Sequence, residues 1–349
     1  MEFKTKSIIP ALTGLRAVAA WMIFGLHFFP MQNPAIPEFL KKIVSQWHIG
    51  VDIFFVLSGF LITYRYFGKK VNIKQYMVNR FARIYPMYFL ITVGVFINFF
   101  IVNRYWDTEK TIEAVLSFTM TKALFDKYFL TAGISQGWTL TLEEMFYFTA
   151  PLYFVLIARK KIWLLILPVA IFLFGTFLKN ATATPENTWG FMQENISVYI
   201  FEFFAGIFLA IILRNKNLPT YRFPIFTSIG ILFLIFFPLI FSVSFGTNDF
   251  RMAAERIALS GLGIGPLLFG LITEKSLLSR FFSNRIMVLL GKSSYVFYLI
   301  HKGFIPVLIY DYIAENVAVI FILITGLSIL MFKYIEEPLN LWIRKKYAK

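Results

Sequence analysis

The chain has 349 residues, of which 58% are hydrophobic, 19% are aromatic and only 15% are charged. Soluble domains carry about 25% charged residues, so the composition excludes an ordinary soluble protein and indicates a polytopic membrane protein. The lack of cysteine excludes disulfides and thiol nucleophiles, and three histidines are too few to predict a metal site of clustered ligands.

Long apolar stretches recur along the chain and predict its architecture. A helix needs about 20 apolar residues to cross a bilayer, and by that rule the fold class is an all-α polytopic membrane protein with about ten transmembrane helices. No repeat or soluble region interrupts the pattern, so residues 1–349 are expected to form a single transmembrane domain with no appended soluble domain. The predicted spans are 10–29, 50–66, 85–103, 138–158, 162–178, 196–213, 223–243, 256–273, 286–309 and 316–335.

Basic residues gather in alternate connections between the predicted spans. The positive-inside rule then places both the N-terminus and the C-terminus in the cytoplasm. Lys69, Lys70 and Lys74 precede the third span on that side, whereas the longest outer segment, 104–137, mixes charged and aromatic residues and has room for a short amphipathic helix. The formal net charge of +15 is therefore a topology signal, and nucleic acid is not an expected partner.

Arg16 and His27 lie eleven positions apart in the first predicted span. On a helix this spacing returns to nearly the same face, about 16 Å further along the axis. Ionisable residues inside a membrane segment cost free energy, so both are candidate functional residues. A permanent cation paired with a titratable base suits a ligand with an anionic head and a long reach. The alternative is a snorkelling arginine and a histidine bonded to a neighbouring helix.

The stretch WTLTLEEMFYF opens the fourth predicted span and carries Glu143 and Glu144. These neighbours point about 100° apart on a helix, so only one of them can readily face His27. A carboxylate beside an imidazole orients the ring and raises its basicity, which makes Glu143 a candidate catalytic residue. Alternatively, Glu143 is an acid that lies near the lipid headgroups. Trp138 and Tyr147 can likewise be residues of the aromatic belt at the membrane interface.

Polar residues also enter the second and the ninth predicted spans. Asp52 enters the second span at a depth similar to that of His27 and is a candidate site residue. Ser58, next to Gly59, permits close helix packing or the approach of a ligand to the backbone. His301, in the outer third of the ninth span, is a further candidate, with a hydrogen-bonded core histidine as the alternative.

The segment NRFARIYP places Arg80 and Arg83 three positions apart at the start of the third span. On a helix their guanidinium groups are neighbours. Such pairs bind phosphates bidentately, so both arginines are candidate ligand-binding residues. Their alternative is the ordinary positive charge of a cytoplasmic loop.

Together these segments resemble the acyltransferase-3 superfamily of integral membrane O-acyltransferases. The resemblance rests on Arg16 and His27 and on five further segments in family order, which are FFVLSGFL, RFARIYP, WTLTLEEMFYF, GKSSYVFYLIH and YIEEPLN. It implies that an acyl-CoA donor, usually acetyl-CoA, is presented from the cytoplasm. The acceptor implied is a hydroxyl of a sugar or glycan beyond the membrane, and the implied location is a bacterial cytoplasmic (inner) membrane.

The resemblance also implies roles for individual residues. His27 would be the general base that takes the proton of the acceptor hydroxyl, and Glu143 and His301 match positions in family motifs. Some family members carry an extra domain that completes the transfer, so a separate transfer partner is a further expectation. The phosphates of coenzyme A would be held by three arginines, Arg16, Arg80 and Arg83. The proposed chemistry, apart from the resemblance, makes Ser58, Tyr147 or a backbone N–H group a candidate for stabilising the oxyanion.

Two other functions are compatible with charges inside a membrane. A transporter would move a sugar or a lipid-linked glycan intermediate without acyl transfer. A subunit that only docks a partner enzyme would tolerate the loss of both Arg16 and His27. The enzyme hypothesis instead predicts that His27→Ala abolishes transfer by a normally folded protein.

Overall fold

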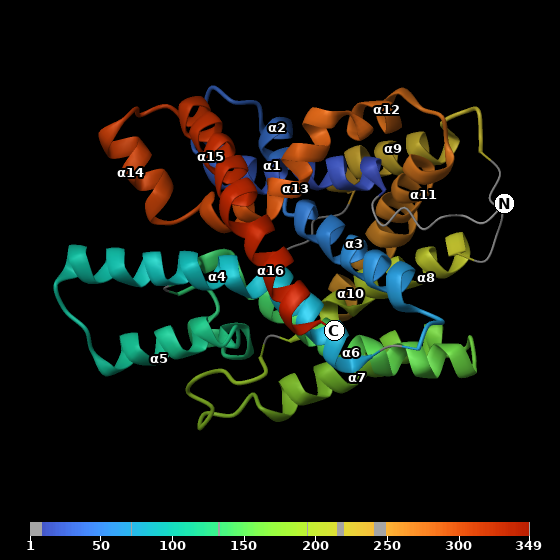
Figure 1. Ribbon diagram of the computed structural model, residues 1–349, viewed down its shortest axis with the longest axis horizontal. Helices are drawn as coiled ribbons and strands as arrows, with labels where there is room; N and C mark the ends of the chain where they lie inside the picture. Colours follow the sequence, from blue (N-terminus) through green and yellow to red (C-terminus); the bar gives the residue numbers. More distant parts are fainter. Residues whose placement is uncertain are drawn as a thin grey trace. The chain divides into compact units, whose positions relative to one another are not determined.

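The computed structural model describes residues 9–70, 72–131, 133–193, 195–214, 220–240 and 249–348. Within these ranges the regular structure is helical, and no β-strand occurs apart from two isolated backbone bridges (Figure 1). The chain divides into two compact units. The first comprises the described parts of Met1–Lys69, Ile157–Pro168 and Val198–Ser294, and the second those of Lys70–Leu156, Val169–Ser197 and Tyr295–Lys349.

The first unit is organised around helix α3 (Ile49–Tyr66), which packs against α1 (Pro10–Phe28) and along α8 (Ile200–Arg214). Further helices of this unit cover these three. They are α2 (Glu38–Ser45), α9 (Ile225–Ile240), α10 (Asp249–Ala258), a π-helical turn (Leu259–Ile264), α11 (Gly265–Thr273) and α12 (Leu277–Ser283).

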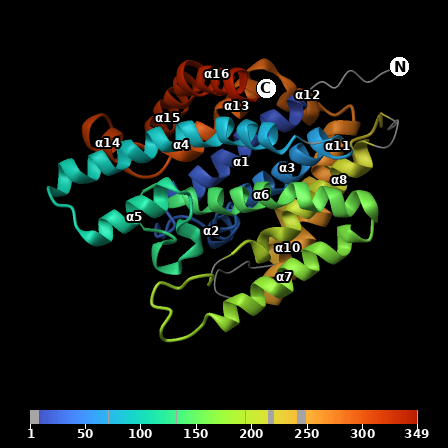
Figure 2. The ribbon, with the colours of Figure 1, turned by 60° about the horizontal axis from the view of Figure 1, so that its bottom comes forward.

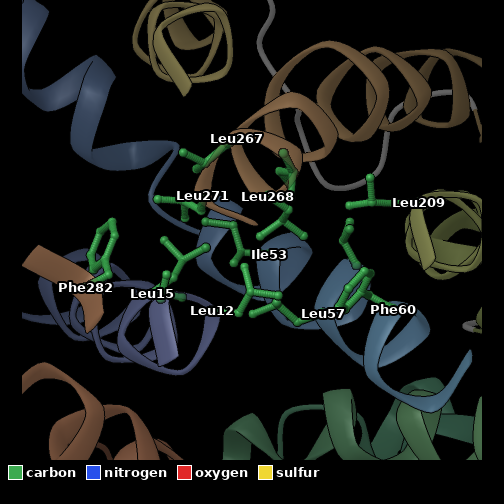
Figure 3. Close-up of a cluster of buried hydrophobic side chains, with 14 of the residues drawn as sticks. Leu12, Leu15, Ile53, Leu57, Phe60, Leu209, Leu267, Leu268, Leu271 and Phe282 are labelled. Atoms are coloured by element: carbon green, nitrogen blue, oxygen red, sulfur yellow. The ribbon is translucent and has the colours of Figure 1, made fainter. Parts of the chain in front are cut away.

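The apolar core of the first unit lies where α1, α3 and α11 meet (Figure 3). Leu15, Ile53 and Leu268 are each at most 3% exposed there. In lipid, moving an apolar side chain from the bilayer into the protein gains little, because hydrocarbon is as apolar as leucine. This core is therefore stabilised mainly by close van der Waals contact between side chains.

Glycine permits a close contact between α3 and α8 in the first unit. A Cβ atom added at Gly59 of α3 would overlap the carbonyl oxygen of Phe203 on α8. A Cβ atom added at Gly206 of α8 would overlap the carbonyl oxygen of Val56 on α3. Small residues that let two backbones approach are typical of helix contacts in membranes. Close helix packing, one of the two roles considered for the segment around Ser58, is thus observed at Gly59.

The second unit contains a hairpin of α4 (Ile73–Asn103) and α5 (Thr108–Phe118), in which α5 runs back along α4 (Figure 2). The hydroxyls of Tyr85 and Tyr88 donate to carbonyls of the last α5 residues, over 3.1 and 2.9 Å. The amphipathic helix for which the segment 104–137 has room is confirmed as α5. Three short 3-10 turns follow it before the next long helix.

The remaining helices of the second unit follow near the C-terminus. A π-helical turn (Phe332–Glu336) joins α15 (Val317–Met331) to α16 (Glu337–Tyr347), and the two helices run on from one another in Figure 1. α16 packs along α4, and the Gln75 side-chain amide donates to the carbonyl of Ala348 over 2.8 Å. The helices are α14 (Phe304–Tyr312), α15 (Val317–Met331) and α16 (Glu337–Tyr347). Three helices, α6 (Trp138–Arg159), α7 (Trp163–Ala181) and α13 (Arg285–Ile300), contribute residues to both units.

Eight helical stretches in the described ranges are long and apolar enough to cross a membrane, which confirms an all-α polytopic membrane protein, whereas about ten spans were predicted. The prediction of one continuous span over 286–309 was wrong. Helix α13 ends at Ile300, and Gly303 has a φ of +103°, a conformation that only glycine adopts readily and that interrupts the helix before α14. The span predicted at 223–243 contains a shorter apolar helix, Ile225–Leu239, and its positions 241–243 lie outside the described residues.

The contact between α3 and α8 can be tested by adding one methyl group. Gly59→Ala should lower the free energy of unfolding by about 1–3 kcal/mol, because the added carbon overlaps backbone that cannot rotate away. Thermal unfolding of the detergent-purified protein measures the effect. Gly326→Ala is the matched control, since a Cβ atom there meets nothing within 4 Å. Equal stability of the two variants would contradict the close contact.

Candidate active site

Helix α1 carries the first pair of candidate residues. Pro10 occupies its first turn, where the fixed φ of proline suits helix initiation, and the apolar run continues to Phe28. The Arg16 side chain is half-buried. Its Nε donates to the Ser294 hydroxyl over 3.4 Å, and its Cζ lies 5.5 Å from the centre of the Phe54 ring. The first span thus meets the GKSSYVFYLIH segment at Arg16, within one unit.

His27 lies in the last turn of the same helix, and its side chain is exposed. The unbroken helix confirms that Arg16 and His27 share one element, so helical rise separates them by about 16 Å. A cationic imidazole is favourable in the last turn because the carbonyl end of a helix carries partial negative charge. An exposed imidazole on a rigid helix is accessible to a substrate and can take a proton from it.

Asp52 joins a buried ion network in the first unit. The Nη1 atom of Arg256 forms an ion pair with Asp52 and a second one with Glu202, at 2.7 Å from the Glu202 Oε1 atom. All three side chains are at most 3% exposed. The Arg256 Cζ atom also lies 3.9 Å from the centre of the Tyr199 ring. One guanidinium therefore links α3, α8 and α10, and it gives Asp52 a structural partner.

The two arginines of α4 lie in the second unit, on one helix as predicted. The Cζ atom of Arg80 lies 5.4 Å from the centre of the Tyr147 ring. Arg83 forms an ion pair with the buried carboxylate of Glu336, and its Cζ lies 5.9 Å from the centre of the Tyr295 ring. Aromatic faces and a carboxylate therefore hold both guanidinium groups in position.

Helix α6 brings Glu143 and Tyr147 together, one turn apart. The Tyr147 hydroxyl donates to the Glu143 carboxylate, while the Tyr147 ring faces Arg80. The backbone carbonyl of Tyr147 accepts a hydrogen bond of 2.8 Å from the Tyr76 hydroxyl on α4. The structure thus joins a carboxylate, a phenol and a guanidinium in one cluster. His27 belongs to the other unit, so its pairing with Glu143 stays a prediction.

Trp138 is the first residue of α6, and its ring stacks on that of Phe129 with 5.0 Å between the centroids. The contact fixes the start of the helix against the segment that follows α5. Ser58, the other small polar candidate, is 8% exposed and lies next to the α3–α8 contact.

His301 follows the end of α13 and is fully buried. Its Nδ1 atom lies 2.7 Å from the Tyr298 carbonyl oxygen. Because a carbonyl can only accept, we assign the proton of the neutral ring to Nδ1, which leaves the lone pair on Nε2. The ring lies parallel to that of Phe297, with 6.1 Å between the centroids. The structure thus fixes both the tautomer and the plane of this imidazole.

Gln136 ties this histidine to the start of α6. Its side-chain amide donates to the carbonyls of Tyr298 and Leu299, over 2.9 and 3.0 Å. The hydroxyls of Thr139 and Tyr298 are also hydrogen-bonded, at 2.9 Å. The WTLTLEEMFYF and GKSSYVFYLIH segments therefore meet through polar contacts in the second unit.

Sequence reasoning missed three residues that these contacts depend on: Arg256, Glu336 and Gln136. A signal for Arg256 was present, because Glu202 inside an apolar span needs a counter-charge and Arg256 begins another apolar stretch. Glu336 could have been found in the same way as a partner for Arg83. No spacing or charge pattern distinguishes Gln136, whose role follows only from the tertiary contact.

Lys122 is an unusual buried cation in the segment after α5. It is 1% exposed, and its Nζ atom donates to the Ile134 carbonyl over 2.6 Å. Burial lowers the pKa of Lys122 to about 7, partly opposed by the nearby Glu113 carboxylate. The ammonium thus helps to hold the turn that leads into α6, at the cost of desolvating a charge.

The candidate residues supply three kinds of chemical group. Imidazole can accept a proton, carboxylate can orient an imidazole, and guanidinium can bind phosphate. Within the part of the chain that the structure describes, no group of three or more histidine or acidic side chains is arranged to hold a metal ion.

Comparison with known proteins identifies relatives for nearly the whole chain. Residues 9–334 match the family model Acyl_transf_3, described as an acyltransferase domain. Acyltransferase MdmB of Streptomyces mycarofaciens is 25% identical over 320 residues, covering 84% of this chain and 78% of MdmB. No solved structure matches.

Two further relatives are longer than this chain. A Staphylococcus aureus (strain COL) protein provisionally named an O-acetyltransferase is 22% identical, over 97% of this chain and 58% of its own length. YrhL of Bacillus subtilis (strain 168), provisionally named a peptidoglycan O-acetyltransferase, is 25% identical, over 95% of this chain and 55% of its own length. The chain therefore spans little more than half of these two relatives.

The ion network around Arg256 predicts a large effect of removing its cation. Arg256→Met leaves the Asp52 and Glu202 carboxylates buried without their partner and should cost about 3–5 kcal/mol of stability. The triple variant with Asp52→Asn and Glu202→Gln removes every charge and should recover most of the loss. Thermal unfolding in detergent compares the three proteins. A triple variant no more stable than Arg256→Met would contradict the network.

Lys122 predicts a pH-dependent stability. Its folded-state pKa is about 7, whereas an unfolded chain has an ordinary lysine pKa of about 10.4. Between these two pKa values the unfolded state binds more protons than the folded state, so the free energy of unfolding rises with pH. This gain in stability is lost as the pH falls to 7. From pH 7.5 to 9.5 the free energy of unfolding of the wild type should rise, relative to that of Lys122→Met, by up to about 1 kcal/mol per pH unit.

Thermal unfolding across this pH range measures the difference. The exposed Lys127, whose pKa is raised by its hydrogen bond with Glu109, gives the matched control Lys127→Met. That variant should follow the wild type at each pH. Parallel curves for the wild type and Lys122→Met would show that Lys122 does not titrate in this range.

Proposed function

The chain belongs to this acyltransferase family, and we propose that it is a membrane O-acyltransferase that transfers an acyl group from acyl-CoA to a hydroxyl. The acyl group expected is acetyl, and the acceptor expected is a sugar or glycan on the outer side of the membrane. The names of the S. aureus and B. subtilis relatives support O-acetylation, and that of YrhL supports a cell-wall glycan as acceptor.

The observation that carries this proposal is the arrangement on α1. A half-buried guanidinium and an exposed imidazole lie on one rigid helix, about 16 Å apart by helical rise. Acyl-CoA has phosphates at one end and a thioester at the other, joined by an extended arm. Arg16 would bind a phosphate while the thioester reaches toward His27. The Ser294 hydroxyl and the Phe54 ring keep Arg16 in position.

The proposed reaction has His27 as the general base. Neutral imidazole takes the proton of the acceptor hydroxyl as its oxygen attacks the thioester carbonyl carbon. The carbonyl double bond re-forms, the carbon–sulfur bond breaks, and the imidazolium returns the proton to the departing thiolate. An ester and coenzyme A are the products. General-base assistance of this kind contributes about 10²–10⁴-fold to the rate.

Arg80 and Arg83 are proposed to bind further phosphates of the donor. The Nη1 atom of Arg83 forms the ion pair with Glu336. A guanidinium has five N–H donors, so Arg83 can bind a phosphate at the same time. The hydrogen-bonded pair of Glu143 and Tyr147, whose tyrosine ring faces the Arg80 guanidinium, is proposed to contribute to the same reaction. A separate transfer partner and a bacterial cytoplasmic membrane location remain part of this proposal.

The test is acyl transfer from labelled acetyl-CoA in membranes that contain the protein, with a panel of glycan acceptors. His27→Ala should lower acceptor-dependent release of coenzyme A by about 10²–10⁴-fold at matched expression. His48→Ala is the matched control, because the His48 ring contacts the Ser45 carbonyl at the loop end of α3. It should retain activity.

Each other outcome has a distinct meaning. Equal transfer by the wild type and His27→Ala would exclude His27 as the base and direct attention to His301. Movement of a glycan across the membrane without consumption of acetyl-CoA would overturn the enzyme proposal in favour of a transporter.

A further inference from the structure

The second unit contains a cavity of about 820 Å³, and Arg80, which is proposed to bind a phosphate of the donor, is one of the residues that line it. Ligand sites commonly enclose about 300–1,000 Å³, so the cavity is large enough for a sizeable ligand. One face of α4, one face of α6, the end of α16 and the residues just after α5 line it. Most of its wall is apolar, formed by methionine, valine, leucine and aromatic side chains such as Met77, Phe81 and Met145.

The cavity lies beside lipid-facing side chains. Phe81, Phe148 and Trp342 line it and are 50%, 66% and 55% exposed. They belong to α4, α6 and α16, which are parts of stretches able to cross a membrane. Exposed aromatic and aliphatic side chains on such helices face hydrocarbon rather than water. A ligand can therefore enter this cavity from the bilayer, as a membrane lipid does.

One end of the cavity is positively charged. Lys74 lines it in the first turn of α4, where the helix N-terminus adds partial positive charge. Trp342 and Tyr347 line the same cavity, and the Lys346 Nζ atom lies 5.0 and 5.1 Å from their ring centres. Two ammonium groups and a helix N-terminus together favour an anionic headgroup at this end.

A buried hydroxyl in the wall points to a polar atom on the ligand. Thr141 lines the cavity, is 3% exposed, and its Oγ1 atom has no hydrogen-bond partner among the described residues. Leaving a buried hydroxyl unbonded costs about 1–3 kcal/mol. An ester carbonyl of a lipid can accept this hydrogen bond. The Glu144 carboxylate, one turn away, and the Arg80 guanidinium also line the cavity.

We propose that this cavity binds one acidic glycerophospholipid of the surrounding membrane. A hydrocarbon chain lies between α4, α6 and α16, the phosphate lies at the end that carries Lys74 and Lys346, and an ester oxygen accepts from Thr141. A bound lipid fills an apolar cavity that water would occupy poorly, and it joins three helices of the second unit. This inference gives Arg80 no role in holding the lipid and leaves it to the donor, and it does not depend on the acyl-transfer proposal.

The test is lipid retention measured by native mass spectrometry. The full chain is purified from bilayers that contain equal amounts of phosphatidylglycerol and phosphatidylcholine. Wild type should retain one phosphatidylglycerol. Lys74→Glu combined with Lys346→Glu should lower that occupancy by about tenfold or more, because each change replaces attraction of the phosphate by repulsion. Lys160→Glu with Lys275→Glu is the matched control, since it changes the same charge at exposed positions outside the cavity.

Two further variants test the cavity if the charge reversals impair folding. Thr141→Val keeps the shape but removes the hydroxyl and should lower occupancy by about fivefold. Met145→Trp fills the apolar part and should displace the lipid without changing charge. Equal retention in cavity variants and control would overturn the proposal. So would equal retention of the two phospholipids, or displacement by added polyprenyl phosphate at stoichiometric amounts.

Discussion

Charges inside this protein must find their partners within it, because a bilayer offers no water to solvate them. Arg256 meets that requirement by pairing with both Asp52 and Glu202, so that a single guanidinium fixes α3, α8 and α10. The Gly59 and Gly206 contact brings two of these helices close enough for the network to form. Apolar burial alone could not specify this arrangement, since lipid competes equally for the same surfaces.

The same requirement shapes the candidate active site. Arg83 is paired with Glu336, Arg80 and Tyr147 are in contact, and Arg16 is held by Ser294 and an aromatic ring. The side chains proposed to bind substrate are therefore held in position before it arrives. Pre-positioned cations lose little conformational entropy on binding, which favours recognition of an anionic donor. His27, at the exposed end of α1, is positioned by the helix itself.

Much of the site could be predicted because membrane segments tolerate few ionisable residues. Arg16, His27 and Glu143 were identified as polar exceptions in apolar stretches, and Arg80 and Arg83 by their spacing at the cytoplasmic side; the structure joins Glu143 to Tyr147, and Tyr147 to Arg80. Their partners were harder to identify. Glu336 and Gln136 lie far along the chain from the residues they contact, and no periodicity connects them. The break at Gly303 was also missed, because apolar composition continues across it while the backbone does not.

The sequence by itself determined the fold class, the membrane setting and the family, because hydropathy and short motifs are local properties that one chain displays directly. It also determined that Arg16 and His27 share a helix, since spacing within one element needs no tertiary information. Only the tertiary structure decided that Arg256 joins Asp52 to Glu202, which imidazole nitrogen of His301 carries the proton, and that an apolar cavity lies beside α4. The ion network and the cavity depend on contacts between segments remote in sequence, and the His301 proton is assigned from the observed position of the Tyr298 carbonyl; no local pattern specifies this packing.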